Sequence, residues 1–69
     1  MKQIIKNNIK EYRLESGITQ DELAREVGVS RQSINSIERE HYIPSLPLAL
    51  KFAKFFRCPV EDLFLLEEK

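Results

Sequence analysis

The chain is poor in the residues that build disulfides and metal sites. Its 69 residues include one cysteine, Cys58, one histidine, His41, and no tryptophan. A single thiol has no internal disulfide partner, and one cysteine with one histidine does not supply the ligands of a zinc site. We therefore expect no disulfide, no metal and no cofactor.

Long hydrophobic runs are also missing. No apolar stretch approaches the roughly 20 residues that a membrane-spanning helix needs. The first ten residues, MKQIIKNNIK, lack the apolar segment of a signal peptide. We expect a soluble cytoplasmic protein that makes no contact with a membrane.

An excess of one charge is absent as well, because the formal net charge is zero. The charges are nevertheless segregated: residues 1–57 carry ten basic and seven acidic side chains, whereas residues 58–69 carry one basic and four acidic. Nucleic-acid affinity depends on the field at the contacting face rather than on the total charge. Zero net charge therefore does not exclude a nucleic-acid partner, from which the acidic C-terminal end should face away.

Residues 19–39, TQDELAREVGVSRQSINSIER, carry the signals of two short helices joined by a tight turn. Thr19 followed by Glu22 is the pattern of a capping box at a helix start. Gly28 suits the left-handed residue that ends a helix, and Ser30 suits the cap of the next one. The residues expected in the core are Leu23, Ala24, Val27, Val29, Ile34 and Ile37.

The second of these helices directs a row of hydrogen-bonding side chains outward. Burial of its two isoleucines leaves four such residues on the opposite face, namely Arg31, Gln32, Asn35 and Ser36. A short, exposed helix of this kind is typical of proteins that read the major groove of DNA. An ordinary helical hairpin with no ligand is the alternative.

The remaining residues predict three more helices. Asn8 followed by Glu11 suggests a capping box for a helix from about Ile9 to Ser16. Ser45 suits the cap of a fourth helix. Its expected buried stripe is Leu46, Ala49, Leu50, Ala53 and Phe56. A short fifth helix is expected from about Val60 to Phe64.

The two ends of the chain are apolar and suited to β-strands. Residues 3–6 read QIIK and residues 64–67 read FLLE. We prefer a two-stranded sheet that pairs them, with frayed ends as the alternative. Because an isolated pair of strands is marginal in water, the sheet should rest on the helices, over Phe52 and Phe55.

Together these features resemble the Cro/C1-type helix-turn-helix regulators, the xenobiotic-response-element family, over Asn8 to Phe64. The resemblance rests on Arg13, the block GITQDELAREVGVSRQSINSIER, the Pro-Ser-Leu entry to the fourth helix and the EDLF ending. Within this family the chain is similar to small stand-alone repressors of the cytolysin-repressor type, which are dimers with a terminal sheet. The resemblance implies an all-α fold: one compact, five-helix, lambda-repressor-like DNA-binding domain over residues 1–69.

The resemblance also implies roles that side-chain chemistry supports. Base reading falls to Arg31, Gln32, Asn35 and Ser36, because arginine can bind guanine and glutamine can bind adenine through two hydrogen bonds. Phosphate contacts fall to Gln20, Ser30, Ser33, Arg39 and Tyr42. The amide of Gln20 has an alternative role in bracing a side chain of the recognition helix. Each of these residues has plain solvation as its other interpretation.

Arg13 and Glu38 match positions that form a partly buried ion pair in phage-type repressors. A phosphate contact is the alternative for Arg13. Phage repressors often carry basic residues after the recognition helix, but residues 40–43 read EHYI in this chain. The resemblance therefore does not extend to a strong clamp on the DNA backbone.

Apolar residues near the C-terminus suggest a dimer. Val60, Leu63, Phe64 and Leu66 exceed what a five-helix core of this size should bury, and such a surplus commonly marks a contact. The monomer core is the alternative location. A two-fold dimer would place two recognition helices about 34 Å apart in successive major grooves, matching an inverted repeat.

The function expected from these observations is sequence-specific binding of double-stranded DNA by a homodimer, acting in transcription as a repressor. No small-molecule ligand is predicted. An enzyme is not expected, because no nucleophile–base pair and no glycine-rich phosphate loop is present in the sequence. The alternative is a protein-interaction module that acts as the antidote to a toxin partner, with or without DNA binding.

Overall fold

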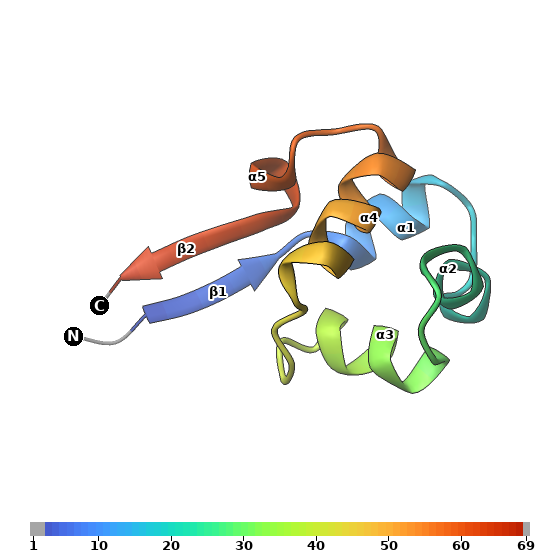
Figure 1. The fold of residues 1–69 in the computed structure, drawn as a ribbon, viewed down its shortest axis with the longest axis horizontal. Coiled ribbons are helices and arrows are strands. Elements are labelled where there is room, and N and C mark those ends of the chain that lie inside the picture. Colours follow the sequence, from blue (N-terminus) through green and yellow to red (C-terminus); the bar gives the residue numbers. More distant parts are fainter. Residues whose placement is uncertain (1–2, 69) are drawn as a thin grey trace.

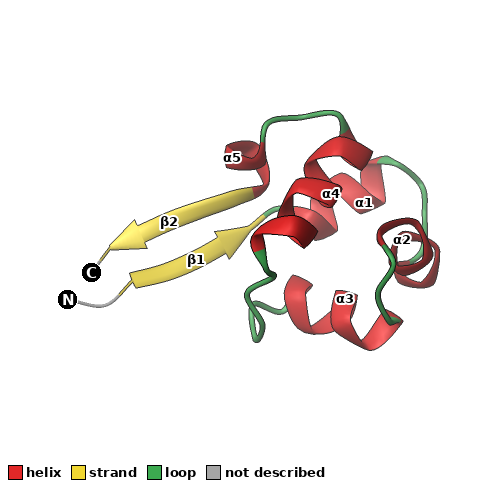
Figure 2. Ribbon diagram, viewed as in Figure 1, coloured by secondary structure: helices red, strands yellow, loops and turns green. Residues whose placement is uncertain are grey.

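The computed structural model describes residues 3–68, and in it five helices pack together while the two chain ends form a sheet (Figure 1). The elements in order are β1 (Gln3–Asn7), α1 (Ile9–Glu15), α2 (Gln20–Val27), α3 (Arg31–Glu38), α4 (Leu46–Phe56), α5 (Val60–Leu63) and β2 (Phe64–Glu68). The strands are antiparallel, and the sheet projects from one side of the helical body (Figure 2). The predicted five helices and terminal sheet are confirmed. None of the helices in this range has the length and apolar character needed to cross a bilayer.

Helix α1 begins differently from the prediction. The expected capping box between Asn8 and Glu11 is wrong, because the Asn8 side chain makes no capping hydrogen bond. Its amide instead donates to the carbonyl of Asp62, at 3.0 Å, and so joins α1 to α5. The first amide of the helix, on Ile9, donates to the side-chain oxygen of Asn7 at 3.1 Å. The cap is therefore supplied one residue earlier than the sequence pattern indicated.

The buried face of α4 is rotated from the predicted stripe. Leu48, Ala49 and Phe52 are buried, whereas Leu46 and Leu50 are 68% and 51% exposed. Placing these two leucines in the core was wrong. Nearly every residue of LPLALKFAKFF is apolar, so helical periodicity alone allows several stripes, and contact with the neighbouring helices selects among them.

The sheet rests on the helical core at the start of β2. The Phe64 ring packs against Phe52, with ring centroids 6.3 Å apart. The backbone N–H of Asn8 donates to the Leu63 carbonyl at 2.8 Å. Phe55 instead meets the edge of Phe56. The buried hydrophobic cluster comprises Ile9, Leu23, Ala24, Val27, Ile34, Ile37, Leu48, Phe52 and Leu63.

Leu63 belongs to this core and not to a dimer surface. Its relative exposure is 0%, so placing it in a subunit interface was wrong. Helix α5 is a single turn, and Leu63 is its only buried residue. The number of apolar residues near the C-terminus does not show which of them points into the core from a single helical turn and which points outward.

We expect Leu63→Ala to destabilise the protein by about 2–5 kcal/mol, because it removes methyl groups from a packed core and leaves a cavity. Leu14→Ala is the control, since Leu14 is 59% exposed on α1 and its truncation should cost about 0.5 kcal/mol or less. Urea unfolding measures both. Equal losses in the two variants would contradict the core position of Leu63.

Candidate nucleic-acid interface

Helix α2 is fixed at its start by a complete capping box. The Thr19 hydroxyl oxygen accepts from the Glu22 backbone at 3.0 Å, and the Thr19 amide donates to the Glu22 carboxylate at 2.8 Å. The hydrogen bond from the Thr19 backbone lowers the pKa of Glu22 below its usual value. The charged carboxylate also suits the positive end of the helix dipole. Helix α2 therefore starts at a defined residue, Gln20.

The turn between α2 and α3 is as short as the sequence indicated. Gly28 has φ +78° and its amide donates to the Ala24 carbonyl at 2.8 Å. A Cβ at Gly28 would meet no atom within 4 Å, so the left-handed backbone rather than space favours glycine here. Ser30 then caps α3 by accepting from the Ser33 amide at 3.1 Å.

One carboxylate, that of Glu38, joins α1, α2 and α3. Arg13 from α1 donates to it through Nε at 2.7 Å and through Nη2 at 3.2 Å. Gln20 from α2 adds a third hydrogen bond at 3.0 Å. The side chains of Arg13 and Glu38 are 10% and 3% exposed, and Arg13 also donates to the Ile18 carbonyl at 3.0 Å. The ion pair is thus buried and well supplied with hydrogen bonds.

Gln20 links this buried pair to the outer face of α3. Its amide donates to Glu38 and also lies 3.4 Å from the side-chain oxygen of Asn35. The geometry is that of the bracing role given above as the alternative to phosphate binding. Gln20 therefore holds the side-chain oxygen of Asn35 from the inner side of α3. The side-chain nitrogen of Asn35 remains available to an external partner.

The four base-reading candidates share one side of α3. Arg31 and Gln32 are exposed in its first turn, and Asn35 and Ser36 follow one turn later, each half-buried. Figure 1 shows α3 along one edge of the molecule, with no other element of the chain outside it. The arrangement leaves hydrogen-bonding groups, rather than apolar ones, on this face of α3.

The phosphate candidates surround that row. Ser30 and Ser33 lie at its start, where their hydroxyl oxygens are 3.0 Å apart and partly committed to the helix cap. Arg39 follows its end, and Tyr42, 48% exposed, lies in the loop to α4. His41 in the same loop is exposed.

Helix α3 ends in a left-handed residue that is not glycine. Glu40 has φ +63°, and the Glu40 and His41 amides donate to the carbonyls of Ile37 and Ser36, each at 2.9 Å. This pair of bonds is the Schellman ending, in which glycine is the usual left-handed residue. A side chain at such a position costs roughly 1–2 kcal/mol.

The Glu40 side chain contacts strand β1. The Asn7 amide donates to its carboxylate at 3.1 Å, and Lys6 Nζ lies 3.7 Å from its other oxygen. The Asn7 side chain donates to the Ile37 carbonyl at 2.8 Å. We call these contacts of Lys6 and Asn7 with Ile37 and Glu40 the clasp. The sequence patterns did not predict the clasp, although a glutamate at a position where a helix ending favours glycine was a signal of it.

An apolar groove lies between the sheet and the start of α4. Its lining residues are Ile5, Ile43, Pro44, Leu46, Ala49, Val60 and Phe64. Val60 and Phe64 are half-buried there. Leu66, which pairs with Ile5 across the sheet, is 57% exposed. Three of the four predicted dimer residues therefore lie in or beside one apolar surface.

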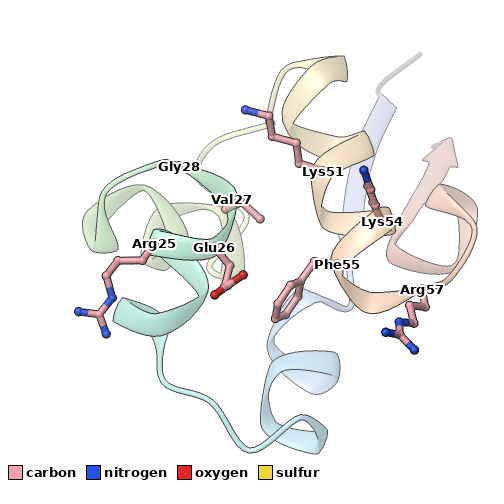
Figure 3. A pocket seen from close by; sticks show the side chains of 8 residues that line it. All are labelled: Arg25, Glu26, Val27, Gly28, Lys51, Lys54, Phe55 and Arg57. Atoms are coloured by element: carbon pink, nitrogen blue, oxygen red, sulfur yellow. The ribbon is translucent and has the colours of Figure 1, made fainter.

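A more polar hollow between α2 and α4 is separate from α3's outer face. Figure 3 shows the ends of Lys51 and Lys54 directed one way and that of Arg57 the opposite way, with the Phe55 ring on the side of α4 that faces α2. Arg25 at its rim is already paired with Asp21, at 3.4 Å. The cations diverge and do not converge on a point. Within residues 3–68, no group of three metal-ligating side chains is found.

We expect Arg13→Met to destabilise the protein by about 3–5 kcal/mol, because Glu38 would remain buried without its cation. Arg25→Met is the matched control: it removes an arginine from an exposed ion pair and should cost at most about 1 kcal/mol. Denaturant unfolding of both variants gives the comparison. Similar losses would show that burial does not govern the Arg13 pair.

Comparisons with known proteins agree with this geometry. A family model described as "Helix-turn-helix" matches residues 9–63, from the start of α1 to the end of α5. An uncharacterised HTH-type transcriptional regulator of Methanocaldococcus jannaschii is 50% identical over 64 residues, covering 93% of this chain and 97% of its own. The uncharacterised HTH-type regulator YgzD of Bacillus subtilis is 48% identical, covering 94% and 98%. One from Archaeoglobus fulgidus is 43% identical, covering 94% and 93%.

The match includes both helices of the motif, their turn and the helices that hold them. The predicted helix-turn-helix identity is therefore confirmed, and this class of protein binds DNA rather than catalysing a reaction. The chain belongs to the helix-turn-helix family of DNA-binding transcriptional regulators.

Proposed function

We propose that the chain is a homodimeric repressor that binds an inverted-repeat operator, with α3 in the major groove of each half-site. The observation that carries this proposal is the set of hydrogen bonds on the inner side of α3. Glu38 and Gln20 hold the inner side of the helix while the residues on its outer side remain available. A reading helix needs this combination, because base contacts require side chains held in a fixed orientation.

Base reading is proposed for Arg31, Gln32, Asn35 and Ser36. Arg31 and Gln32 lie in the first turn of α3, the part of a recognition helix that contacts base edges. The guanidinium of Arg31 can donate two hydrogen bonds to guanine, and the amide of Gln32 can pair with adenine. Asn35, braced by Gln20, would read a base one turn deeper.

Phosphate contacts are proposed for the residues around this row. Ser30 and Ser33 lie at the start of α3, whereas Arg39 and Tyr42 lie after its end. Such contacts fix the register of the protein on the duplex without reading its sequence. Gln20 lies at the N-terminus of α2, and its amide is already used within the protein, so its backbone rather than its side chain would face a phosphate.

A second copy of the chain is the proposed occupant of the apolar groove. The groove walls are almost wholly apolar and include the exposed Ile43 and Leu46, and exposed Leu66 lies beside them. A continuous surface of this kind is unfavourable in water and is typical of a subunit contact. A two-fold contact there would present two α3 helices to one face of a duplex. Val60, Phe64 and Leu66 then act in the interface, without Leu63.

Repression is the proposed mode of action, and we propose with it that the chain is similar to small repressors of the cytolysin-repressor type. A dimer bound across an operator excludes other proteins from the same DNA by occupancy alone. This mode requires no further activity from the domain.

We expect Gln32→Ala to lower affinity for the preferred duplex by about 1–3 kcal/mol and to relax preference at one base pair in each half-site. Selection from a random duplex library at fixed, moderate salt, followed by binding measurements, tests this. Lys10→Gln, a change on the exposed side of α1, is the control and should leave the selected motif unchanged. A motif that is identical for Gln32→Ala would contradict the reading role. Enrichment of no motif by the wild type would favour a protein-partner function.

We expect Leu66→Glu to weaken dimerisation at least about tenfold, because it places a charge in an apolar contact. Leu65→Glu is the matched control: it lies next in the same strand, has a similar exposure of 45% against 57%, and faces the opposite side of the sheet. Sedimentation equilibrium at several concentrations measures the dissociation constant. Equal weakening in both variants would contradict a contact on the groove side of the sheet.

A further inference from the structure

The clasp is not required to end α3. The two backbone bonds that close the helix come from the amides of Glu40 and His41, and a glycine at residue 40 would donate the same bond with less strain. The glutamate nevertheless supplies a carboxylate, and both partners of that carboxylate, Asn7 and Lys6, lie on β1. The Glu40 side chain therefore links the end of α3 to β1, which lies more than 30 residues away in the sequence.

Asn7 is the other half of the link. Its backbone amide donates to Glu40, its side-chain nitrogen donates to the Ile37 carbonyl, and its side-chain oxygen caps α1 at Ile9. One residue thus connects β1, α1 and the last turn of α3. The Lys6 ion pair is longer and more exposed, so it contributes less than the two bonds of Asn7.

We propose that Asn7 and Glu40 are positioning residues for DNA recognition, which fasten the last turn of α3 to the terminal sheet. This inference rests on the proposed role of α3 as the reading helix. The first turn of α3 is held separately, by the Ser30 cap and the turn from α2. The clasp acts on the opposite end, where Ser36 precedes Ile37 and Arg39 precedes Glu40.

The proposal makes a position-specific claim. The C-terminal turn of α3 is fixed both by the bonds of Glu38 to Arg13 and Gln20 and by the clasp. Loosening the clasp removes the second of these and lets the turn move against the sheet, while the N-terminal turn stays in place. Preference should therefore relax at the base pairs read from Asn35 and Ser36 and persist at those read from Arg31 and Gln32. A general loss of stability would instead relax the base preference equally at the positions read from both halves of α3.

The test uses three single variants of the full chain. Glu40→Gly removes the carboxylate and keeps a residue that favours the left-handed backbone. Glu40→Gln also removes the negative charge but keeps an oxygen that can accept from Asn7. Arg57→Gly is the control for glycine itself, because Arg57 occupies the same left-handed position after α4, at φ +57°.

Amide hydrogen exchange without DNA comes first. In Glu40→Gly, exchange of the Asn7 amide and of the last turn of α3 should rise about tenfold, the scale expected when one hydrogen bond is lost. Glu40→Gln and Arg57→Gly should leave these amides close to the wild type. Unchanged exchange in Glu40→Gly would overturn the proposal, because the clasp would then hold nothing.

Selection from the random duplex library follows, with the positions altered by Gln32→Ala marking the N-terminal half of α3. Glu40→Gly should relax the motif at other positions and lower the ratio of specific to non-specific affinity about tenfold. Glu40→Gln shares its charge change and should keep the wild-type ratio. Equal ratios for the two variants, or relaxation at the Gln32 positions, would overturn the positioning role. If the wild type enriches no motif, the proposed function fails and this inference fails with it, whatever hydrogen exchange shows.

Discussion

The rest of the molecule depends on the hydrogen bonds that the buried carboxylate of Glu38 accepts from Arg13 and Gln20. This carboxylate lies on the inner side of α3, almost inaccessible to water, and accepts hydrogen bonds from α1 and α2. A buried carboxylate is unfavourable unless its partners are in place, so the three helices are constrained to one relative arrangement. The outward direction of the opposite face of α3 follows from that arrangement. The fold and the outward face of α3 are in this sense set by the same few bonds.

Helix α3 is held at its start and over its last turn by residues outside the helix. Its start is fixed by the adjacent turn from α2, and its last turn by Arg13 and Gln20, which bind Glu38, and by Asn7, which binds the Ile37 carbonyl. A helix of eight residues is too short to be stable alone in water, so its shape is maintained by these contacts and by burial of two isoleucines. The face with few internal contacts is the one left for a partner.

The local signals in the sequence predicted the motif well. The Thr19 cap, the Gly28 ending and the Ser30 cap all depend on residues within four positions of one another, and the structure shows each of them. The terminal sheet followed from apolar, β-capable ends. The rotation of α4, the location of Leu63 and the true partner of Asn8 were missed because each is decided by contacts far along the chain. The clasp joins residues 7 and 40, and no periodicity in the sequence predicts a contact between residues so far apart.

The pairing of β1 with β2 has a consequence for how the chain is made. Strand β1, which is synthesised before the helices, has its hydrogen-bonding partner in β2, which is synthesised after them. Until the residues of α5 and β2 leave the ribosome, β1 has unpaired backbone groups and the core lacks Leu63. The helices can associate during translation, but the helical domain and its sheet are completed only after β2 emerges. An interrupted translation product that ends before α5 would therefore expose both a free strand edge and an incomplete core, features that favour aggregation or degradation.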